Sequence, residues 1–244
     1  SDNEPETLPA RWKSVAPDLI AGHARLLEDT PLITEKNLPV QAAEKITGLF
    51  AGTDREVVSI SAYLIPSSEL LALAQSLTAQ GVRIRALTNS LASNNHIPAH
   101  TAYRHHRREL LEAGVELHEF RPDAEERSHF EAPGFGAEHV GLHAKILVLD
   151  QRLVFVGTIN ADPRSMVLNT EVSLVIDSPE LAKAVTDAFS PDFLSTNSWR
   201  VSLNDQDEMQ WHSSKGTTDT QPAGSIWQRM GDALFGMLPI DEQM

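Results

Sequence analysis

The sequence predicts an α/β fold with one mixed β-sheet flanked by helices on both faces. A buried-strand pattern at residues 57–62, a helical pattern ending at Gly81 and a second strand at 82–88 form a β-α-β unit, whose strands we expect to be parallel. Two further aliphatic strands, 142–149 and 153–157, are joined by a tight turn and are expected to form a hairpin. The length of 244 residues, with 41% hydrophobic and 22% charged residues, suits one large globular domain or two small ones.

The remaining elements follow from caps, breakers and periodicity. Ser67 or Ser68 can cap the helix that ends at Gly81, and a helix at 101–114 leads into a strand at 115–120. Residues 121–138 are rich in Pro, Gly and charge, which predicts a loop. The other predicted elements are a helix around 39–52, a strand at 171–176, a helix at 178–189 capped by Ser178 with Pro179 first, a hairpin at 199–213, a flexible loop at 214–224 and an amphipathic helix at 225–244.

Composition excludes several classes of protein. A formal net charge of −14 argues against a general nucleic-acid binder, which needs a basic surface. The absence of cysteine excludes disulfides and thiolate metal sites. No apolar run approaches the roughly 18 residues of a membrane span. The chain begins at Ser1 without an initiator methionine, so we expect a truncated or processed piece of a longer protein.

A histidine, a lysine, a threonine and an asparagine interrupt the aliphatic pattern of the hairpin strands. His143 and Lys145 are two residues apart, and alternate residues of a strand point to the same face. Thr158 and Asn160 are also two apart and follow Gly157, which permits a close backbone approach. Because a tight hairpin returns the chain to the same end of the sheet, we expect these four side chains to surround one point.

Those four groups suit a tetrahedral phosphate. Lysine supplies positive charge, asparagine and threonine supply neutral hydrogen bonds, and histidine can attack phosphorus or donate a proton. A metal site fits poorly, because a protonated lysine repels cations and the chain at Gly141 breaks any helix that would align His139 with His143. We therefore expect neither a metal nor another cofactor. Taken singly, each residue has a structural explanation, such as a hydrogen-bonded core histidine or an edge-strand lysine.

The stretch "HAKILVLDQRLVFVGTIN" resembles the HxK(x)4D(x)6G[ST]xN signature of the phospholipase D superfamily. The matching positions are His143, Lys145, Asp150, Gly157, Thr158 and Asn160, with Thr in place of the commoner Ser. The continuation "ADPRSMVLNTE" and the stretches at 61–94 and 103–123 are similar to bacterial cardiolipin synthases, particularly the C-type. The similarity starts near residue 20 and corresponds to the C-terminal half of a two-motif synthase.

This resemblance implies a two-step reaction without metal. One histidine attacks the phosphodiester phosphorus to form a phosphohistidine while a second histidine protonates the leaving alcohol, and an incoming alcohol or water then takes the phosphatidyl group. Lys145 and Asn160 would hold the phosphate oxygens, with Thr158 assisting. Glu171 lies where the family places a carboxylate that orients the imidazole. Asp150, at the hairpin turn, receives a structural role, as does Gly157.

A single HxK motif supplies half of such a site, since in the superfamily two halves meet across a pseudo-two-fold axis. We expect the partner to be a missing N-terminal half or a second copy, and the fragment alone to be inactive. Whether His143 is the nucleophile or the acid/base stays open. We divide the chain into a lead-in at 1–20, a phospholipase D-like catalytic half at 21–200, and a hairpin, flexible loop and amphipathic helix at 201–244.

The implied function is phosphatidyl transfer on membrane phospholipids such as phosphatidylglycerol. The resemblance places the full-length parent peripherally on the inner (cytoplasmic) membrane and leaves this fragment soluble, without specifying the phosphatidyl donor, the acceptor or the membrane side. One alternative is a phosphodiesterase, phospholipase D or nuclease of the same superfamily, although the charge of −14 counts against DNA. Another is a non-catalytic interaction module that keeps the fold, against which the intact motif counts.

Three other features have two interpretations each. The basic segment 104–108 could receive an anionic head group or form a solvated helix face. Polar and turn residues after the first two parallel strands could line a pocket or pack a loop; they are Tyr63, Pro66, Asn89 and Ser90. The last helix carries an apolar stripe that could dock on the core, dock on the absent half or touch a membrane, made of Ile226, Trp227, Met230, Leu234, Phe235 and Leu238.

Overall fold

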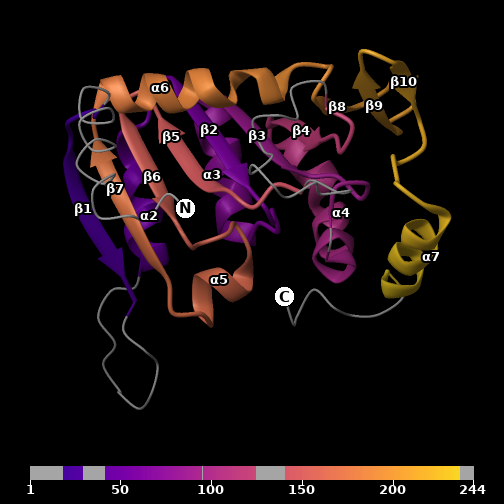
Figure 1. Cartoon of the computed structure of the whole chain (residues 1–244), viewed down its shortest axis with the longest axis horizontal. Coiled ribbons are helices and arrows are strands. Elements are labelled where there is room, and N and C mark those ends of the chain that lie inside the picture. The colour runs from indigo at the N-terminus through magenta and orange to yellow at the C-terminus, as the bar shows by residue number, and fades with distance from the viewer. Residues whose placement is uncertain (1–18, 30–41, 95, 125–140, 237–244) are drawn as a thin grey trace, which may run out of the picture.

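The computed structural model describes residues 19–29, 42–94, 96–124 and 141–236. Within these ranges one ten-stranded sheet has the order β1-β7-β6-β5-β2-β3-β4-β8-β9-β10. Figure 1 shows the strands in this order, with helices packed on the sheet. The predicted α/β fold with a mixed sheet is confirmed. The lead-in before residue 19, most of the loop predicted at 121–138, and His139 and Leu238 lie outside the described residues.

The predicted β-α-β unit forms the centre of the sheet. Strands β2 (Glu56–Ser61), β3 (Arg83–Asn89) and β4 (Glu116–Phe120) pair in parallel. Helices α3 (Ser68–Ala79) and α4 (Ile97–Glu112) connect them. The parallel strands therefore end at one edge of the sheet, where their last residues and the loops that follow come together.

The predicted helix boundaries follow local backbone chemistry. The Ser67 side chain accepts a hydrogen bond from the N–H of Leu70, which caps α3 as predicted. After the two helices, Gly81 and Gly114 have φ of 91° and 83°, a left-handed conformation that glycine adopts without strain.

Four antiparallel strands extend the sheet on the other side of β2. They are β5 (Lys145–Leu149), β6 (Leu153–Gly157), β7 (Val172–Asp177) and β1 (His23–Glu28). The β5–β6 hairpin and β7 were predicted, whereas β1 was not, because only one of its six residues is buried and its sequence shows no alternation. The tight turn between β5 and β6 has φ of 52° at Asp150 and 53° at Gln151, as a hairpin turn of the primed type requires.

The C-terminal third continues the same sheet. Helix α6 (Pro179–Phe189) is capped by Ser178 as predicted, and the predicted hairpin forms as β8 (Ser198–Leu203) and β9 (Met209–Ser213). The flexible loop predicted at 214–224 instead contains a short strand, β10 (Gly216–Thr218), which pairs with β9. The boundary predicted at residue 200 falls within β8. The remaining helices are α2 (Ala42–Leu49), α5 (Pro163–Val167) and α7 (Ile226–Phe235).

Alternation along β5 divides the core into two layers. Leu147 and Leu149 pack in the cluster that includes residues of α2, α3 and α4, whereas Val148 packs in the cluster that includes Ala182 of α6. The two-residue period of the strand thus fixes which side chains face which helix layer. Lys145 falls on the α3 side by the same rule. No helix within the described ranges is long and apolar enough to cross a membrane.

His118 of β4 gives the fold a pH dependence. Burial, followed by the positive charge of Arg200, lowers the pKa of this imidazole from 6.5 to about 4, and its side chain lies against Ser198 and Phe193. Since the unfolded chain binds the proton at a higher pH than the folded chain, the free energy of unfolding falls as the pH drops between these two values. We expect protonation of this imidazole to lower the free energy of unfolding by about 3 kcal/mol as the pH falls from 6.5 to about 4.

Urea unfolding across that pH range, in the wild type and in His118→Gln, measures this contribution. The variant should show a shallower loss of stability than the wild type. Identical pH profiles for the two proteins would contradict the assignment.

Candidate active site

The side chains of His143 and Lys145 meet at the end of the sheet where β5 begins. Lys145 Nζ donates to the backbone carbonyl of His143 at 2.9 Å and lies 3.4 Å from each nitrogen of the imidazole. The predicted strand 142–149 included His143, but β5 begins at Lys145, so His143 lies just before the strand. His143 is exposed, and Lys145 is half-buried. The pair therefore stands together where a substrate has access.

A buried carboxamide holds the backbone immediately before His143. The Oδ1 of Asn89 accepts the N–H of Leu142 at 2.8 Å, and its Nδ2 donates to the Leu142 carbonyl at 2.8 Å. This double pairing imitates a neighbouring strand. Nδ2 also donates to the carbonyl of Ala62 at 3.1 Å, and Asn89 is 4% exposed. Asn89 thus ties the end of β3 to the chain that carries the histidine.

Asn160 lies in the segment after β6 and lines the same cavity as Lys145. After β6 the chain crosses to the end of β2, where the N–H of Ala161 donates to Ser61 Oγ at 3.2 Å and Leu64 forms a parallel bridge to Ala161. Asn160 is 9% exposed, and among the described residues its Oδ1 has no hydrogen-bond partner. Together with Lys145 it lines an apolar cavity of about 120 Å³ on the α3 side of the sheet. The free oxygen can accept a hydrogen bond from a donor such as the hydroxyl of an incoming alcohol.

Thr158 is not brought into this group. Its hydroxyl donates to the carbonyl of Val172 at 3.2 Å and accepts the Val172 N–H at 3.0 Å, which extends the pairing of β6 with β7. A Cβ at Gly157 would lie 1.9 Å from Ser173 Oγ, so the strands can approach this closely only with glycine there. A phosphate contact from Thr158 stays a prediction, and it requires the hydroxyl to leave Val172.

Glu171 is buried but does not hydrogen-bond His143 within the described structure. Its Oε1 accepts from Asn169 Nδ2 at 3.0 Å. Burial lowers the pKa of Lys145, and the negative charges of Glu171 and Asp162 oppose this shift. Glu171 therefore acts electrostatically on the lysine in this arrangement. Its predicted role in orienting the histidine stays a prediction.

Asp162 is a site residue that the sequence analysis missed. Its side chain accepts the N–H of Ser165 at 2.7 Å, which caps α5, and it is 6% exposed. Burial raises the pKa of its carboxyl, while the hydrogen bonds from Ser165 act in the opposite direction. The Asp-Pro pair at residues 162–163 is a typical helix start and was the available signal.

Asp150 lies at the far end of β5, away from the histidine. Its carboxylate accepts the backbone N–H groups of Asp54, Arg55 and Glu56 at 3.0, 2.9 and 2.9 Å. These bonds fasten the β5–β6 turn to the start of β2. The position of Asp150 accords with a structural role, because it fixes the register of the strand that carries Lys145.

A second, polar cavity of about 160 Å³ adjoins His143. Its lining includes Tyr63 and Asn89 as well as Ala92, Ser93, Asn94, Gly141 and Leu142. A Cβ at Gly141 would lie 2.7 Å from the carbonyl oxygen of Ser93, so this wall also requires glycine. The sequence left open whether Tyr63, Pro66, Asn89 and Ser90 line a pocket or pack a loop. Tyr63 and Asn89 line this polar cavity and Pro66 lines the apolar one, whereas the Ser90 hydroxyl hydrogen-bonds Ser93 within its own loop.

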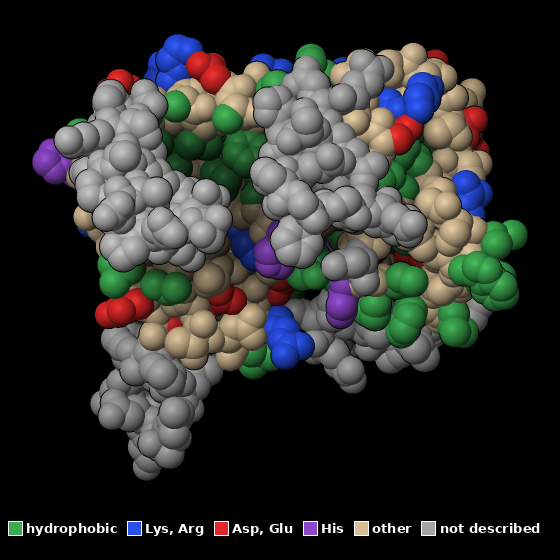
Figure 2. Space-filling view, in the orientation of Figure 1, with side chains coloured by type: hydrophobic (Ala, Val, Ile, Leu, Met, Phe, Trp, Pro, Cys, Tyr) green, Lys and Arg blue, Asp and Glu red, His purple; other side chains and the backbone are tan. Residues whose placement is uncertain are grey.

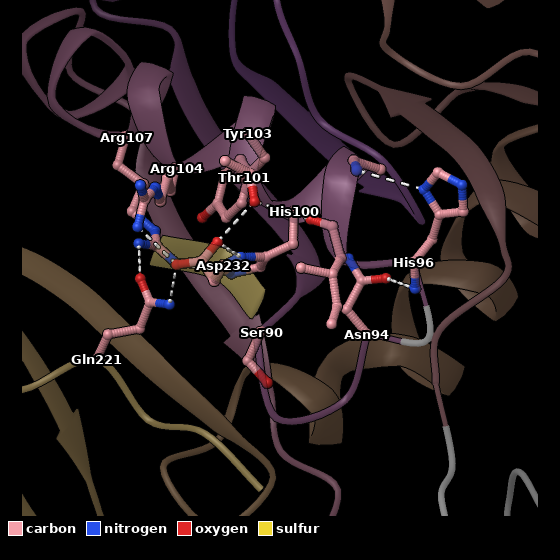
Figure 3. A network of polar contacts seen from close by, with 12 residues as sticks. Ser90, Asn94, His96, His100, Thr101, Tyr103, Arg104, Arg107, Gln221 and Asp232 are labelled. Atoms are coloured by element: carbon pink, nitrogen blue, oxygen red, sulfur yellow. Dashed lines mark hydrogen bonds and ion pairs between the residues drawn. The ribbon is translucent and has the colours of Figure 1, made fainter. Parts of the chain in front are cut away.

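The basic segment 104–108 is largely neutralised by carboxylates. Arg104 pairs with Asp232, Arg107 with Glu119, and Arg108 with Asp207, each at 2.6 Å, and His106 lies 2.7 Å from Glu109. Figure 3 shows Arg104 directed toward Asp232 and Arg107 toward Gln221. These contacts favour an internal structural role over the binding of an anionic head group.

A mixed sheet with an accessible His-Lys pair at the start of a central strand defines the class of phospholipase D-like domains. Residues 51–193 match the family described as cardiolipin synthase, PLD-like domain, and the chain belongs to this family. The resemblance predicted from the motif at 143–160 is thereby confirmed.

Two curated relatives show the extent of the similarity. The chain is 32% identical over 230 residues to cardiolipin synthase C of Escherichia coli (strain K12), covering 91% of this chain and 48% of that protein. It is 31% identical over 148 residues to cardiolipin synthase A of Buchnera aphidicola subsp. Acyrthosiphon pisum (strain APS), covering 61% of this chain and 26% of that protein. The chain thus spans about half, or less, of the length of these relatives.

Two solved structures share the fold. Nuc from Salmonella typhimurium, a phospholipase D family member, superposes with a TM-score of 0.53 and 13% identity, over 74% of this chain and 99% of that chain. Phosphatidylserine synthase from Haemophilus influenzae Rd KW20 superposes with a TM-score of 0.51 and 16% identity, over 78% of this chain and 46% of that chain. At these identities the likeness supports the fold alone.

We expect Asn89→Ala to release the segment that carries His143. The substitution orphans the buried N–H and carbonyl of Leu142, so the free energy of unfolding should fall by about 2–4 kcal/mol. Hydrogen exchange of the Leu142 amide should accelerate more than that of Val148 in the middle of β5. Equal acceleration at both amides would indicate general destabilisation, and unchanged exchange at Leu142 would contradict the role assigned to Asn89.

Proposed function

We propose that this chain supplies one half of the active site of a cardiolipin synthase-like phosphatidyltransferase. Membership of the cardiolipin synthase, PLD-like domain family supports this proposal. The observation that carries it is the 3.4 Å separation between Lys145 Nζ and the imidazole nitrogens of His143 at an accessible end of β5. A cation beside a potential nucleophile suits an anionic phosphodiester.

The reaction divides a difficult displacement at phosphorus into two steps. In the first, a histidine nitrogen forms a bond to phosphorus as the P–O bond to the leaving alcohol breaks, and a second histidine gives its proton to that alcohol's oxygen. In the second step, that second histidine removes a proton from an incoming alcohol, whose oxygen forms a bond to phosphorus as the P–N bond breaks and the first histidine is released. Lys145 and Asn160 bind the non-bridging oxygens, where negative charge concentrates. His143 fills one of the two histidine roles.

A second HxK half completes the site in this proposal. Either the remainder of a longer chain or a second copy of this one would provide it. An exposed apolar row across three strands offers a surface for such a partner, with Leu26 paired to Leu174 and Leu174 paired to Val156. Val156 immediately precedes Gly157, so this row reaches the site end of β6. The other proposed partners are phosphatidylglycerol or a related phospholipid, and the surface of the inner membrane.

Two substitutions in the full-length protein test this function. We expect His143→Ala and Lys145→Met each to lower phosphatidyl transfer in phosphatidylglycerol vesicles by about 1,000-fold or more, since each removes a group needed at phosphorus. The matched control His106→Ala removes an imidazole on α4 and should retain activity. Mass spectrometry of the lipid products provides the measurement.

Four further outcomes are informative. Quenching turnover with alkaline denaturant, in which a P–N bond survives, should trap the phosphatidyl group on the nucleophilic histidine, and its position assigns the role of His143. Turnover of plasmid DNA but not of phospholipid would favour the nuclease alternative. Full activity of His143→Ala would overturn the proposed function and favour a non-catalytic module. Full transfer activity by a strictly monomeric preparation of this fragment would instead contradict the proposal that the chain supplies only half of the site.

A further inference from the structure

Helix α7 is an amphipathic helix docked through its polar side. The buried residue on this helix is Asp232, which is 3% exposed. The large apolar side chains point outward instead, with Ile226 69%, Trp227 74%, Met230 56% and Leu234 63% exposed. A surface helix of a globular protein usually has the opposite orientation. The predicted alternative in which this stripe docks on the core is therefore wrong for these four residues.

A network of polar contacts holds α7 against α4. Asp232 Oδ1 accepts from Thr101 Oγ1 at 2.8 Å and lies 3.3 Å from His100 Nδ1, and its Oδ2 accepts from Arg104 at 2.6 Å. Figure 3 shows these side chains converging on Asp232 between the two helices, with Gln221 beside them. Burial alone would raise the pKa of Asp232, but the hydrogen bond and charge of His100, followed by the contacts of Thr101 and Arg104, lower it to about 2.

Two glycines allow the close approach of α7 to α4. A Cβ at Gly231 would lie 3.1 Å from Ile97 Cδ1, and a Cβ at Gly236 would lie 1.9 Å from Arg104 Nη2. These glycines share with Asp232 the side of α7 that faces α4. The helix is thus fixed by small and charged residues, and its apolar stripe is held outward by the native contacts.

The start of α7 lies near the loop that lines the polar cavity. Gly224, just before α7, is close to the carbonyl oxygen of Ala92, since a Cβ there would lie 3.6 Å away. Ala92 lines the polar cavity that includes His143. Figure 2 shows hydrophobic side chains gathered over α7 at the right-hand edge of this face. A surface that contacts the N-terminal end of the stripe would therefore lie near the loop that contains Ala92.

We propose that α7 docks on the surface of a phospholipid bilayer and holds the His143 site against it; this inference rests on the proposed function. Among the residues that the structure describes, Trp227 is the most exposed large hydrophobic one, and tryptophan favours the interface between water and lipid. The exposed charged residue of α7 is Arg229, a cation, because Asp232 is buried. A chain of net charge −14 thus presents a positive and apolar element at this position, which complements anionic phospholipid.

Co-sedimentation of the 244-residue chain with vesicles tests this inference without requiring turnover. We expect binding to vesicles that contain phosphatidylglycerol, and the double variant Trp227→Ser/Leu234→Ser should bind about 10-fold or more weakly. Arg229→Gln should reduce the preference for phosphatidylglycerol over phosphatidylcholine. The matched control Leu194→Ser, at an exposed leucine outside both α7 and the apolar row of β1, β7 and β6, should bind as the wild type does. Thermal unfolding of each variant checks that the fold is retained.

Quenching by brominated lipid provides a second measurement. Wild-type fluorescence should be quenched, and Trp227→Phe should remove most of the quenching. Vesicle binding that is unchanged in the double variant would overturn the inference. It would also be overturned if the double variant lost self-association, or binding to the second half, while still binding lipid. His143→Ala should bind vesicles normally, so failure of the proposed chemistry and failure of this docking surface are distinguishable.

Discussion

The candidate site depends on the pair of hydrogen bonds between the carboxamide of Asn89 and the backbone of Leu142. The histidine lies outside the regular ladder of β5, where backbone pairing alone would leave the chain free to move. Asn89 pairs with the backbone of Leu142, three residues before β5, using both a donor and an acceptor at 2.8 Å. The side chain of Lys145 then completes the arrangement by bonding the His143 carbonyl. The end of a parallel strand thereby positions a residue more than fifty positions further along the chain.

The electrostatics of the site follow from the same placement. Lys145 lies where the strand enters the core, so burial disfavours its charge while Glu171 and Asp162 favour it. The negative charge of a bound phosphodiester would stabilise the ammonium form of this partly buried lysine. Asn160 contributes a buried carboxamide beside it, on the wall of an apolar cavity. The site therefore combines one charge, one amide and one accessible imidazole.

The sequence predicted the central parts of the fold and left its margins undetermined. Alternation, caps and glycine stops placed β2 to β7 together with α3 and α4, because those signals are local, whereas the short helix α5 was not predicted. Strand β1 was missed since it is held by pairing with β7 rather than by its own pattern. The motif predicted the His143–Lys145 pair and a nearby Asn160, which lines the same cavity as Lys145, yet it could not show that the Thr158 hydroxyl bonds Val172. Asn89, Asp162 and the inverted orientation of α7 arise from contacts between segments distant in sequence.

The most direct measurement is nuclear magnetic resonance of the ¹⁵N-labelled imidazole of His143 during titration with inorganic phosphate. If the lysine and the histidine form one anion-binding point, the ring nitrogens of His143 shift as phosphate is added, and Lys145→Met abolishes the response. A His143 resonance that does not respond, or that responds equally in Lys145→Met, would contradict the account.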